Sequence, residues 1–143
     1  MMDISINEAM KQLKKLDSEL KSVLRNFGEY CDNVTFDSND SDESFMHDQI
    51  YIIVNKLDAA HKNIAYLSKP ITDQGFIKHN SLKRYELPSG HYFQSGSVCE
   101  ILVSSRGTQK WIYTSIEHNG EDYYATALGQ DTSINGMMVR TRR

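Results

Sequence analysis

The feature that most constrains the fold lies in the last sixty residues, 84–143, where short β-branched and aromatic runs alternate with turn residues. The clearest strand runs from Lys110 to His118, because its bulky residues alternate between two faces. Asn119 and Gly120 follow it, and an Asn-Gly pair accepts the positive φ angles of a tight hairpin turn. Five or six such strands, with turn signals every eight to twelve residues, predict a small antiparallel β-barrel. The order of long loop, three-stranded meander, short helical turn and closing strand favours an SH3-like barrel over an OB-fold.

Two apolar patterns in the first half of the chain predict two helices, one from Ile4 to Phe27 and one from Ser44 to Leu67. Apolar residues recur in both at alternating steps of three and four, which is typical of a packed helix seam. The seams are Ile6, Ala9, Leu13, Leu16, Leu20, Val23 and Phe27 in the first helix, and Met46, Ile50, Ile53, Leu57, Ala60, Ile64 and Leu67 in the second. Ser5 followed by Glu8 fits a capping box at the first helix start. Two seams of equal length predict an antiparallel helical hairpin.

Other apolar residues of the second helix lie outside its seam: Tyr51, Ile52, Val54 and Tyr66. They predict a second buried face, which either meets the β module or meets another chain in a four-helix bundle. The chain is therefore expected to be α+β. Its predicted domains are an acidic α-helical hairpin over residues 1–68, a linker over 69–83 and a small SH3-like antiparallel β-barrel over 84–143.

The charge of the chain is unevenly distributed. The formal net charge is −3, but residues 1–66 hold seven Lys and Arg against twelve Asp and Glu, and residues 67–143 hold nine against seven. The first part therefore carries −5 and the second +2, which indicates two units with different partners. This balance is far from the strongly basic one that is typical of nucleic-acid binders.

The two cysteines, Cys31 and Cys99, form neither a disulfide framework nor a Cys-x-x-Cys pair, so both are expected to be reduced thiols. The first residues lack the apolar core of a signal peptide, and no run approaches 18 apolar residues. A cytoplasmic protein without a membrane span is therefore expected. No cofactor, metal site or catalytic residue is predicted, because the histidines have no metal-ligand spacing and a Cys99–His91 pair lacks a third group.

Aromatic and basic residues are concentrated in the β module and give the first candidate site. Small barrels use exposed aromatic residues to bind extended peptides or to stack on bases. The candidate groove consists of Tyr85, Tyr92, Trp111, Tyr113 and Tyr123. The alternative is that Trp111 and Tyr124 are core residues and the others rim the core with their hydroxyls in water. The basic residues Arg106, Lys110, Arg140 and Arg142 either converge at one end of the barrel to contact phosphate or an acidic protein, or are simply solvated.

The connection between the helices gives the second candidate site, an acidic loop with Asp37, Asp40, Asp42 and Glu43. Its spacing resembles a calcium loop, but the Gly and Glu that such a loop needs at positions six and twelve are Asp42 and Asp48 here. A flexible acidic loop is the simpler interpretation. If the loop has a function, its carboxylates would imitate nucleic acid and occupy a basic groove on a nuclease.

Several short motifs of the β module resemble a known family: Leu87-Pro-Ser-Gly90, Ile116-Glu-His118 with Tyr123-Tyr124, and Ile134-Asn-Gly136 with Val139-Arg140. Over about Tyr85 to Arg142 the chain resembles the bacterial family known as domain of unknown function 5348, whereas the helical part resembles no family. The resemblance implies an accessory protein of a plasmid, prophage or integrative element, and it supplies no catalytic residues.

The sequence thus predicts a non-enzymatic protein that acts by protein–protein contact, as an accessory of a bacterial mobile element. One version of this hypothesis is inhibition of a host defence nuclease, as anti-CRISPR proteins do. The alternative is a nucleic-acid-binding regulator that uses the aromatic and basic face of the barrel. A homodimer formed through the helices is compatible with both hypotheses.

Overall fold

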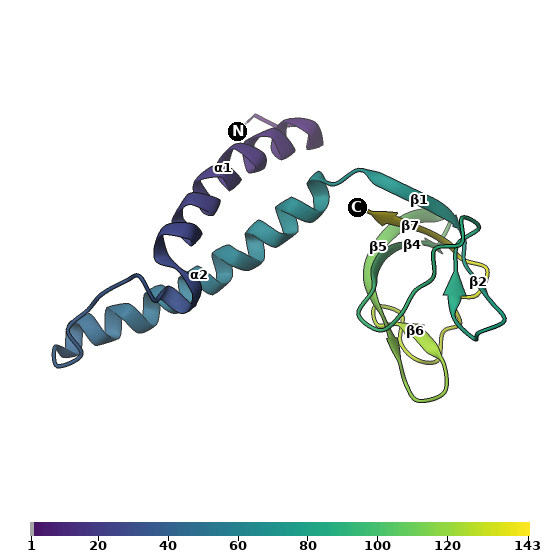
Figure 1. The fold of residues 1–143 in the computed structure, drawn as a ribbon. Coiled ribbons are helices and arrows are strands. Elements are labelled where there is room, and N and C mark those ends of the chain that lie inside the picture. The colour runs from purple at the N-terminus through teal and green to yellow at the C-terminus, as the bar shows by residue number, and fades with distance from the viewer. Residues whose placement is uncertain (1) are drawn as a thin grey trace. The chain divides into compact units, whose positions relative to one another are not determined.

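The chain divides into two compact units in a computed structural model that describes residues 2–143 (Figure 1). The first, which we call the hairpin unit, ends at Ser68. The second, the sheet unit, comprises Lys69–Arg143. No helix among residues 2–143 is long and apolar enough to cross a membrane. Two helices followed by antiparallel strands confirm the predicted α+β class.

The hairpin unit consists of α1 (Ile6–Phe27), a short 3₁₀ turn η1 (Glu29–Cys31) and α2 (Ser41–Ser68). The Ser5 hydroxyl accepts a hydrogen bond from the Glu8 backbone N–H at 3.1 Å, as the capping box predicts. Helix α1 ends at Gly28, which has φ +78° and where a Cβ would lie 2.8 Å from Asn33 Nδ2. Only glycine therefore suits this position.

The contact between α1 and α2 is narrow and includes only part of the predicted seams, namely Leu20 and Ile64 among its buried residues. Asp17 and Leu20 of α1 and Val54 and Ile64 of α2 are buried. His61 Nδ1 lies 2.8 Å from Asp17 Oδ1 in this contact. The prediction that both seams form the hairpin interior is wrong for the seam residues Ile6, Leu13, Leu16, Met46, Ile53 and Leu67, which are exposed. The physical reason is that two helices alone bury only the one line along which they touch.

The sheet unit has a five-stranded antiparallel sheet in the order β1-β7-β4-β5-β6. A separate two-stranded sheet pairs β2 with β3. The strands of the large sheet are β1 (Ile71–Phe76), β4 (Val98–Ser105), β5 (Thr108–His118), β6 (Tyr123–Ala125) and β7 (Met138–Arg142), and those of the small one are β2 (Lys78–His79) and β3 (Tyr85–Glu86). The large sheet is not closed into a barrel, so the predicted SH3-like barrel is not confirmed.

The prediction that residues 69–83 form a linker is wrong, because this segment contains β1 and β2. Strand β1 pairs with β7, from Ile71 opposite Arg142 to Phe76 opposite Met138. Its sequence, ITDQGF, lacks the alternation that marks a strand, since it lies at an edge and most of its residues are exposed. A pairing with residues about sixty-five positions away leaves no local signal in the sequence.

One face of the large sheet packs on the core. Cys99 and Ile101 of β4, Ile116 of β5 and Val139 of β7 point into it, and the neighbouring segments add Ile77, Tyr85, Leu87, Phe93, Ala125 and Ile134. Residues alternate along each strand, so Glu100, Leu102, Trp111, Tyr113, Met138 and Arg140 lie on the opposite face, which we call the outer face.

The turn after β3 packs against the core-side face of β1 at Gly75. A Cβ at Gly75 would lie 2.6 Å from Cδ of Pro88 and 2.9 Å from its Cγ. The Ser89 hydroxyl also donates a hydrogen bond to the carboxylate of Asp73 on β1. These two contacts hold the turn against β1.

We expect Gly75→Ala to destabilise the sheet unit by about 1 to 3 kcal/mol, because the new methyl group overlaps the Pro88 ring. Urea unfolding followed by circular dichroism measures this change. Gln74→Ala on the same strand is the matched control and should change the free energy of unfolding by about 0.5 kcal/mol or less. A full-size effect of Gly75→Ala in a Pro88→Ala background would contradict the explanation.

Candidate interaction surface

The outer face of the sheet carries a row of apolar side chains from four adjacent strands. Phe76 of β1 is opposite Met138 of β7, and Leu102 of β4 is opposite Trp111 of β5. Since Ile101 is opposite Val139, the next position of the same register places Leu102 beside Met138. Phe76 is 55% exposed and the other three side chains are half-buried. We call Phe76, Met138, Leu102 and Trp111 the apolar row.

A carboxylate clamped by two guanidinium groups lies next to the apolar row. Nε and Nη2 of Arg140 donate to Oε1 of Glu100 at 2.9 and 2.7 Å. Nε of Arg142 donates to Oε2 of Glu100 at 2.7 Å, and its Nη1 donates to the Lys69 carbonyl at 3.1 Å. The Arg140 guanidinium also lies 4.0 Å from the centre of the Trp111 ring. This stacking joins the Glu100 cluster (Glu100, Arg140 and Arg142) to the apolar row.

The predicted convergence of basic residues at one end of the sheet is wrong. Arg106 lies in the turn between β4 and β5, and Lys110 is opposite Val103 near that turn. Arg140 is opposite Glu100, six positions further along β4 from Arg106. At about 3.3 Å per residue, Arg106 is separated from Arg140 by roughly 20 Å along the sheet and Lys110 by roughly 10 Å.

The five residues of the predicted aromatic groove do not lie together in the structure. Trp111 and Tyr113 lie on the outer face, and Tyr113 is opposite Glu100. Tyr85, in contrast, is 2% exposed and belongs to the core, so it cannot line a groove. Burial raises the pKa of its hydroxyl. Tyr92 is exposed beside β3 beneath the Arg84 guanidinium, and Tyr123 packs against the core with its ring edge-on to His118.

The carboxylates of the acidic loop stabilise the start of α2. Oδ1 of Asp40 accepts hydrogen bonds from the backbone N–H groups of Asp42 and Glu43 at 2.9 and 3.1 Å, which is the geometry of a helix N-cap. This cap explains why α2 begins at Ser41, three residues before the predicted start. Asp37 accepts from the Asn39 N–H, and Glu43 accepts from the Asp37 N–H. The carboxylates of Asp37, Asp40 and Glu43 therefore have a local structural role, Asp42 contributes only its backbone N–H, and all four residues are exposed.

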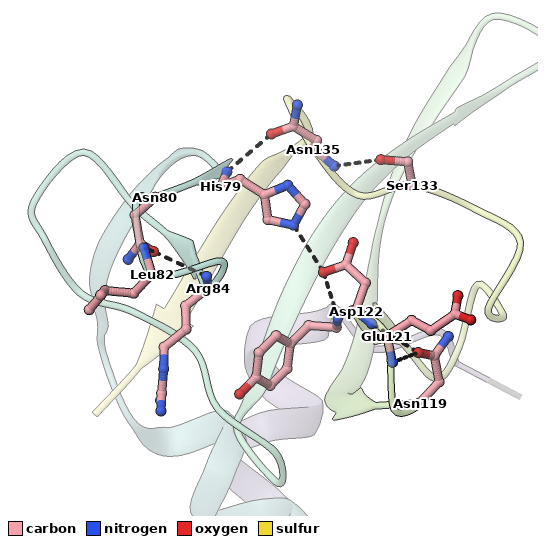
Figure 2. A network of polar contacts seen from close by, with 10 residues as sticks. His79, Asn80, Leu82, Arg84, Asn119, Glu121, Asp122, Ser133 and Asn135 are labelled. Atoms are coloured by element: carbon pink, nitrogen blue, oxygen red, sulfur yellow. Dashed lines mark hydrogen bonds and ion pairs between the residues drawn. The ribbon is translucent and has the colours of Figure 1, made fainter.

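A polar network that the sequence did not reveal joins β2 to the β5–β6 hairpin (Figure 2). Nε2 of His79 lies 3.0 Å from Oδ1 of Asp122, and the His79 backbone N–H donates to the Asn135 side chain at 3.3 Å. His79 and Asp122 line an open cavity of about 330 Å³ with Asn80, Lys83 and Glu121. No local pattern could have indicated this pair, because 43 positions separate its members.

The polar clusters do not have the geometry of a nucleophilic site. Ser89, Asp73 and His91 lie together, but Ser89 donates to Asp73 and the His91 ring contacts Arg143. Burial and the charge of Arg143 lower the pKa of His91. Cys99 is fully buried, and burial together with Glu100 raises the pKa of its thiol to about 12. Within residues 2–143 no three His, Cys, Asp or Glu side chains are grouped so that they could hold a metal ion.

We expect Glu100→Gln to destabilise the sheet unit by roughly 2 to 3 kcal/mol, because two guanidinium groups lose their buried counter-charge. The cost stays below that of a fully buried pair, since Arg140 and Arg142 keep 18% and 17% side-chain exposure and can turn to water. Chemical denaturation gives the value, and Glu117→Gln on β5 is the control. Equal stability of Glu100→Gln and the natural protein would show that the cluster contributes little.

A second prediction concerns the buried thiol of Cys99. Burial and the charge of Glu100 raise the folded-state pKa of Cys99 from its ordinary value of 9.0 to about 12. The unfolded chain therefore loses this proton first, and the contribution of Cys99 to stability is lost as pH rises from about 9 towards 12. At pH 8 a thiol reagent should modify Cys99 only after denaturant is added. Rapid modification of Cys99 in the native Cys31→Ser variant would contradict the burial.

Comparison with known proteins finds no match among curated proteins and none among solved structures. A match exists among protein families, and it starts at Gly75, ten residues before the start expected from the motifs. It includes all four residues of the apolar row and the Glu100–Arg140 pair, but none of the hairpin unit. Residues 75–141, from the end of β1 to the penultimate residue of β7, match the family described as Domain of unknown function (DUF5348), which confirms the resemblance for the C-terminal part of the chain.

Proposed function

We propose that this chain is a non-enzymatic interaction protein that binds another protein through the apolar row of the sheet unit. The observation that carries the proposal is the continuity of the row, with four apolar side chains across four strands and Phe76 more than half exposed. Contiguous apolar side chains on an open surface are typical of protein-binding sites. Trp111 and Arg140 belong to the residue types that contribute most at such sites.

The charge arrangement on the outer face favours a protein partner over nucleic acid. Phosphate binding requires guanidinium and ammonium groups whose donors point outward. Here the Nε donors of both Arg140 and Arg142 are directed at the buried Glu100, and their two charges are offset by its one. Arg106 and Lys110 lie elsewhere on the sheet. In a nucleic-acid-binding regulator, the alternative, Arg140 and Arg142 would have to redirect these Nε donors to phosphate.

The biological setting is a further part of the proposal. The family resemblance supports an accessory protein of a bacterial mobile element, and contact with a host defence nuclease, as in anti-CRISPR proteins, is one form of this role. The exposed carboxylates of Asp37, Asp40, Asp42 and Glu43 would contribute to that form as a nucleic-acid mimic. Asp40 caps α2, and Asp37 and Glu43 bond within the loop; these roles do not require a partner, so the apolar row remains the stronger support.

The proposal predicts that Phe76→Glu weakens partner binding at least tenfold, because a charge is placed in the apolar row. The partner is first captured from lysate of the natural host with the full chain and identified by mass spectrometry. Its affinity for the purified natural chain and for Phe76→Glu is then measured by calorimetry. Leu82→Glu is the matched control, since Leu82 is exposed but lies in the turn after β2.

Nucleic-acid binding is tested with the same proteins by titration of DNA and RNA at several salt concentrations. Direct phosphate contacts would lower the logarithm of affinity by about 0.7 to 0.9 per log unit of salt for each contact. Such binding, unchanged in Phe76→Glu, would contradict the proposal. An equal affinity of the captured protein for Phe76→Glu and the natural chain would also contradict it.

A further inference from the structure

The hairpin unit leaves apolar residues exposed or half-buried at seven-residue intervals on both helices. Leu16 on α1 and Met46, Ile53 and Leu67 on α2 are exposed, whereas Ala9 and Val23 on α1 and Ala60 on α2 are half-buried. Leu16 is 48% exposed and Ile53 is 54% exposed. A seven-residue apolar repeat is typical of helices that pack against other helices along their length.

These two stripes lie on the same side of the hairpin. In the middle of both stripes, Leu16 immediately precedes Asp17, Ile53 precedes Val54 and Ala60 precedes His61, and these three following residues lie at the contact between the helices. One residue corresponds to a rotation of about 100° around the helix axis. Because α1 and α2 run in opposite directions, the same rotation turns both stripes to one side of the plane that contains the two axes. The stripes thus form one surface, which we call the hairpin face.

The borders of the hairpin face carry opposite charges on the two helices. On α1, Glu19 follows Leu16 by three positions and precedes Val23 by four. On α2, Lys56 follows Ile53 by three positions and precedes Ala60 by four. Both are exposed, and neither has an ion-pair partner within residues 2–143. The same contrast holds for whole helices, since α1 carries five basic and three acidic residues and α2 carries two basic and four acidic ones.

From this complementarity we infer that the hairpin face binds a second copy of this chain, giving an antiparallel four-helix bundle. The two-fold arrangement places α1 of one copy over α2 of its partner, so that Glu19 meets the partner's Lys56 on both sides of the bundle. The other face-to-face arrangement stacks α1 on α1 and brings like charges together. The dimer covers the exposed Leu16, Ile53 and Met46, which two helices alone cannot bury.

Analytical ultracentrifugation of the full chain tests this inference, with a protomer mass of 16.4 kDa as reference. The natural chain is expected to sediment as a dimer. Glu19→Lys and Lys56→Glu should each weaken dimerisation about tenfold. Each charge reversal replaces two attractive pairs by two like-charged pairs, because the two-fold axis repeats the contact. The double variant should restore the natural dissociation constant. Lys11→Glu, on the opposite side of α1, is the control and should leave it unchanged.

Ile53→Glu should lower dimer affinity at least a hundredfold, because it places a charge in the centre of the hairpin face. Far-UV circular dichroism and the Cys99 thiol-protection assay check that each variant remains folded. A monomer at every concentration up to about 100 μM would overturn the inference, as would a dimer insensitive to Ile53→Glu. Failure of the double variant to recover affinity would overturn the arrangement of α1 over the partner's α2.

Discussion

The Glu100 cluster is the interaction on which the sheet unit most depends. Strand β7 pairs with β4 through only two opposed residue pairs, Glu100 with Arg140 and Ile101 with Val139. Arg140 and Arg142 add three side-chain hydrogen bonds to one buried carboxylate across this short seam. Because β1 pairs with β7 alone, the position of β1 depends on the same seam. The cluster thus connects the first and last strands of the unit to its long central hairpin.

The same cluster underlies the binding preference that we propose for the outer face. A carboxylate on this face holds the guanidinium donors, and Trp111 covers one of them. The apolar row lies beside these paired charges, and this arrangement is what supports our proposal of a protein partner. A structural ion pair and a proposed binding preference therefore have one physical cause, namely the direction in which Arg140 and Arg142 donate.

Prediction from the sequence succeeded where the signal is local. The Ser5 cap, the end of α1 at Gly28 and the strand Lys110–His118 follow from residues a few positions apart, and the structure has all of them. It failed where partners are distant in the chain. Strand β1 was predicted to be a linker, Tyr85 was assigned to a groove although it is core, and the His79–Asp122 pair was not anticipated. The candidate site was half predicted, since Trp111, Tyr113 and Arg140 were named but Phe76, Leu102 and Met138 were not.

The sequence by itself determined the element types, the division into an acidic helical part and a strand-rich part, and the family of the latter, because periodicity, caps and turn residues act within a few positions. Only the tertiary structure decided which side of each element faces inward. Strand pairing turned Glu100 and Trp111 outward together and Tyr85 inward, and a contact through Asp17 and His61 left Leu16 and Ile53 exposed. The physical reason is that an apolar pattern in the sequence shows only which residues are apolar. Whether such a residue is buried depends on which part of the chain packs against it in three dimensions.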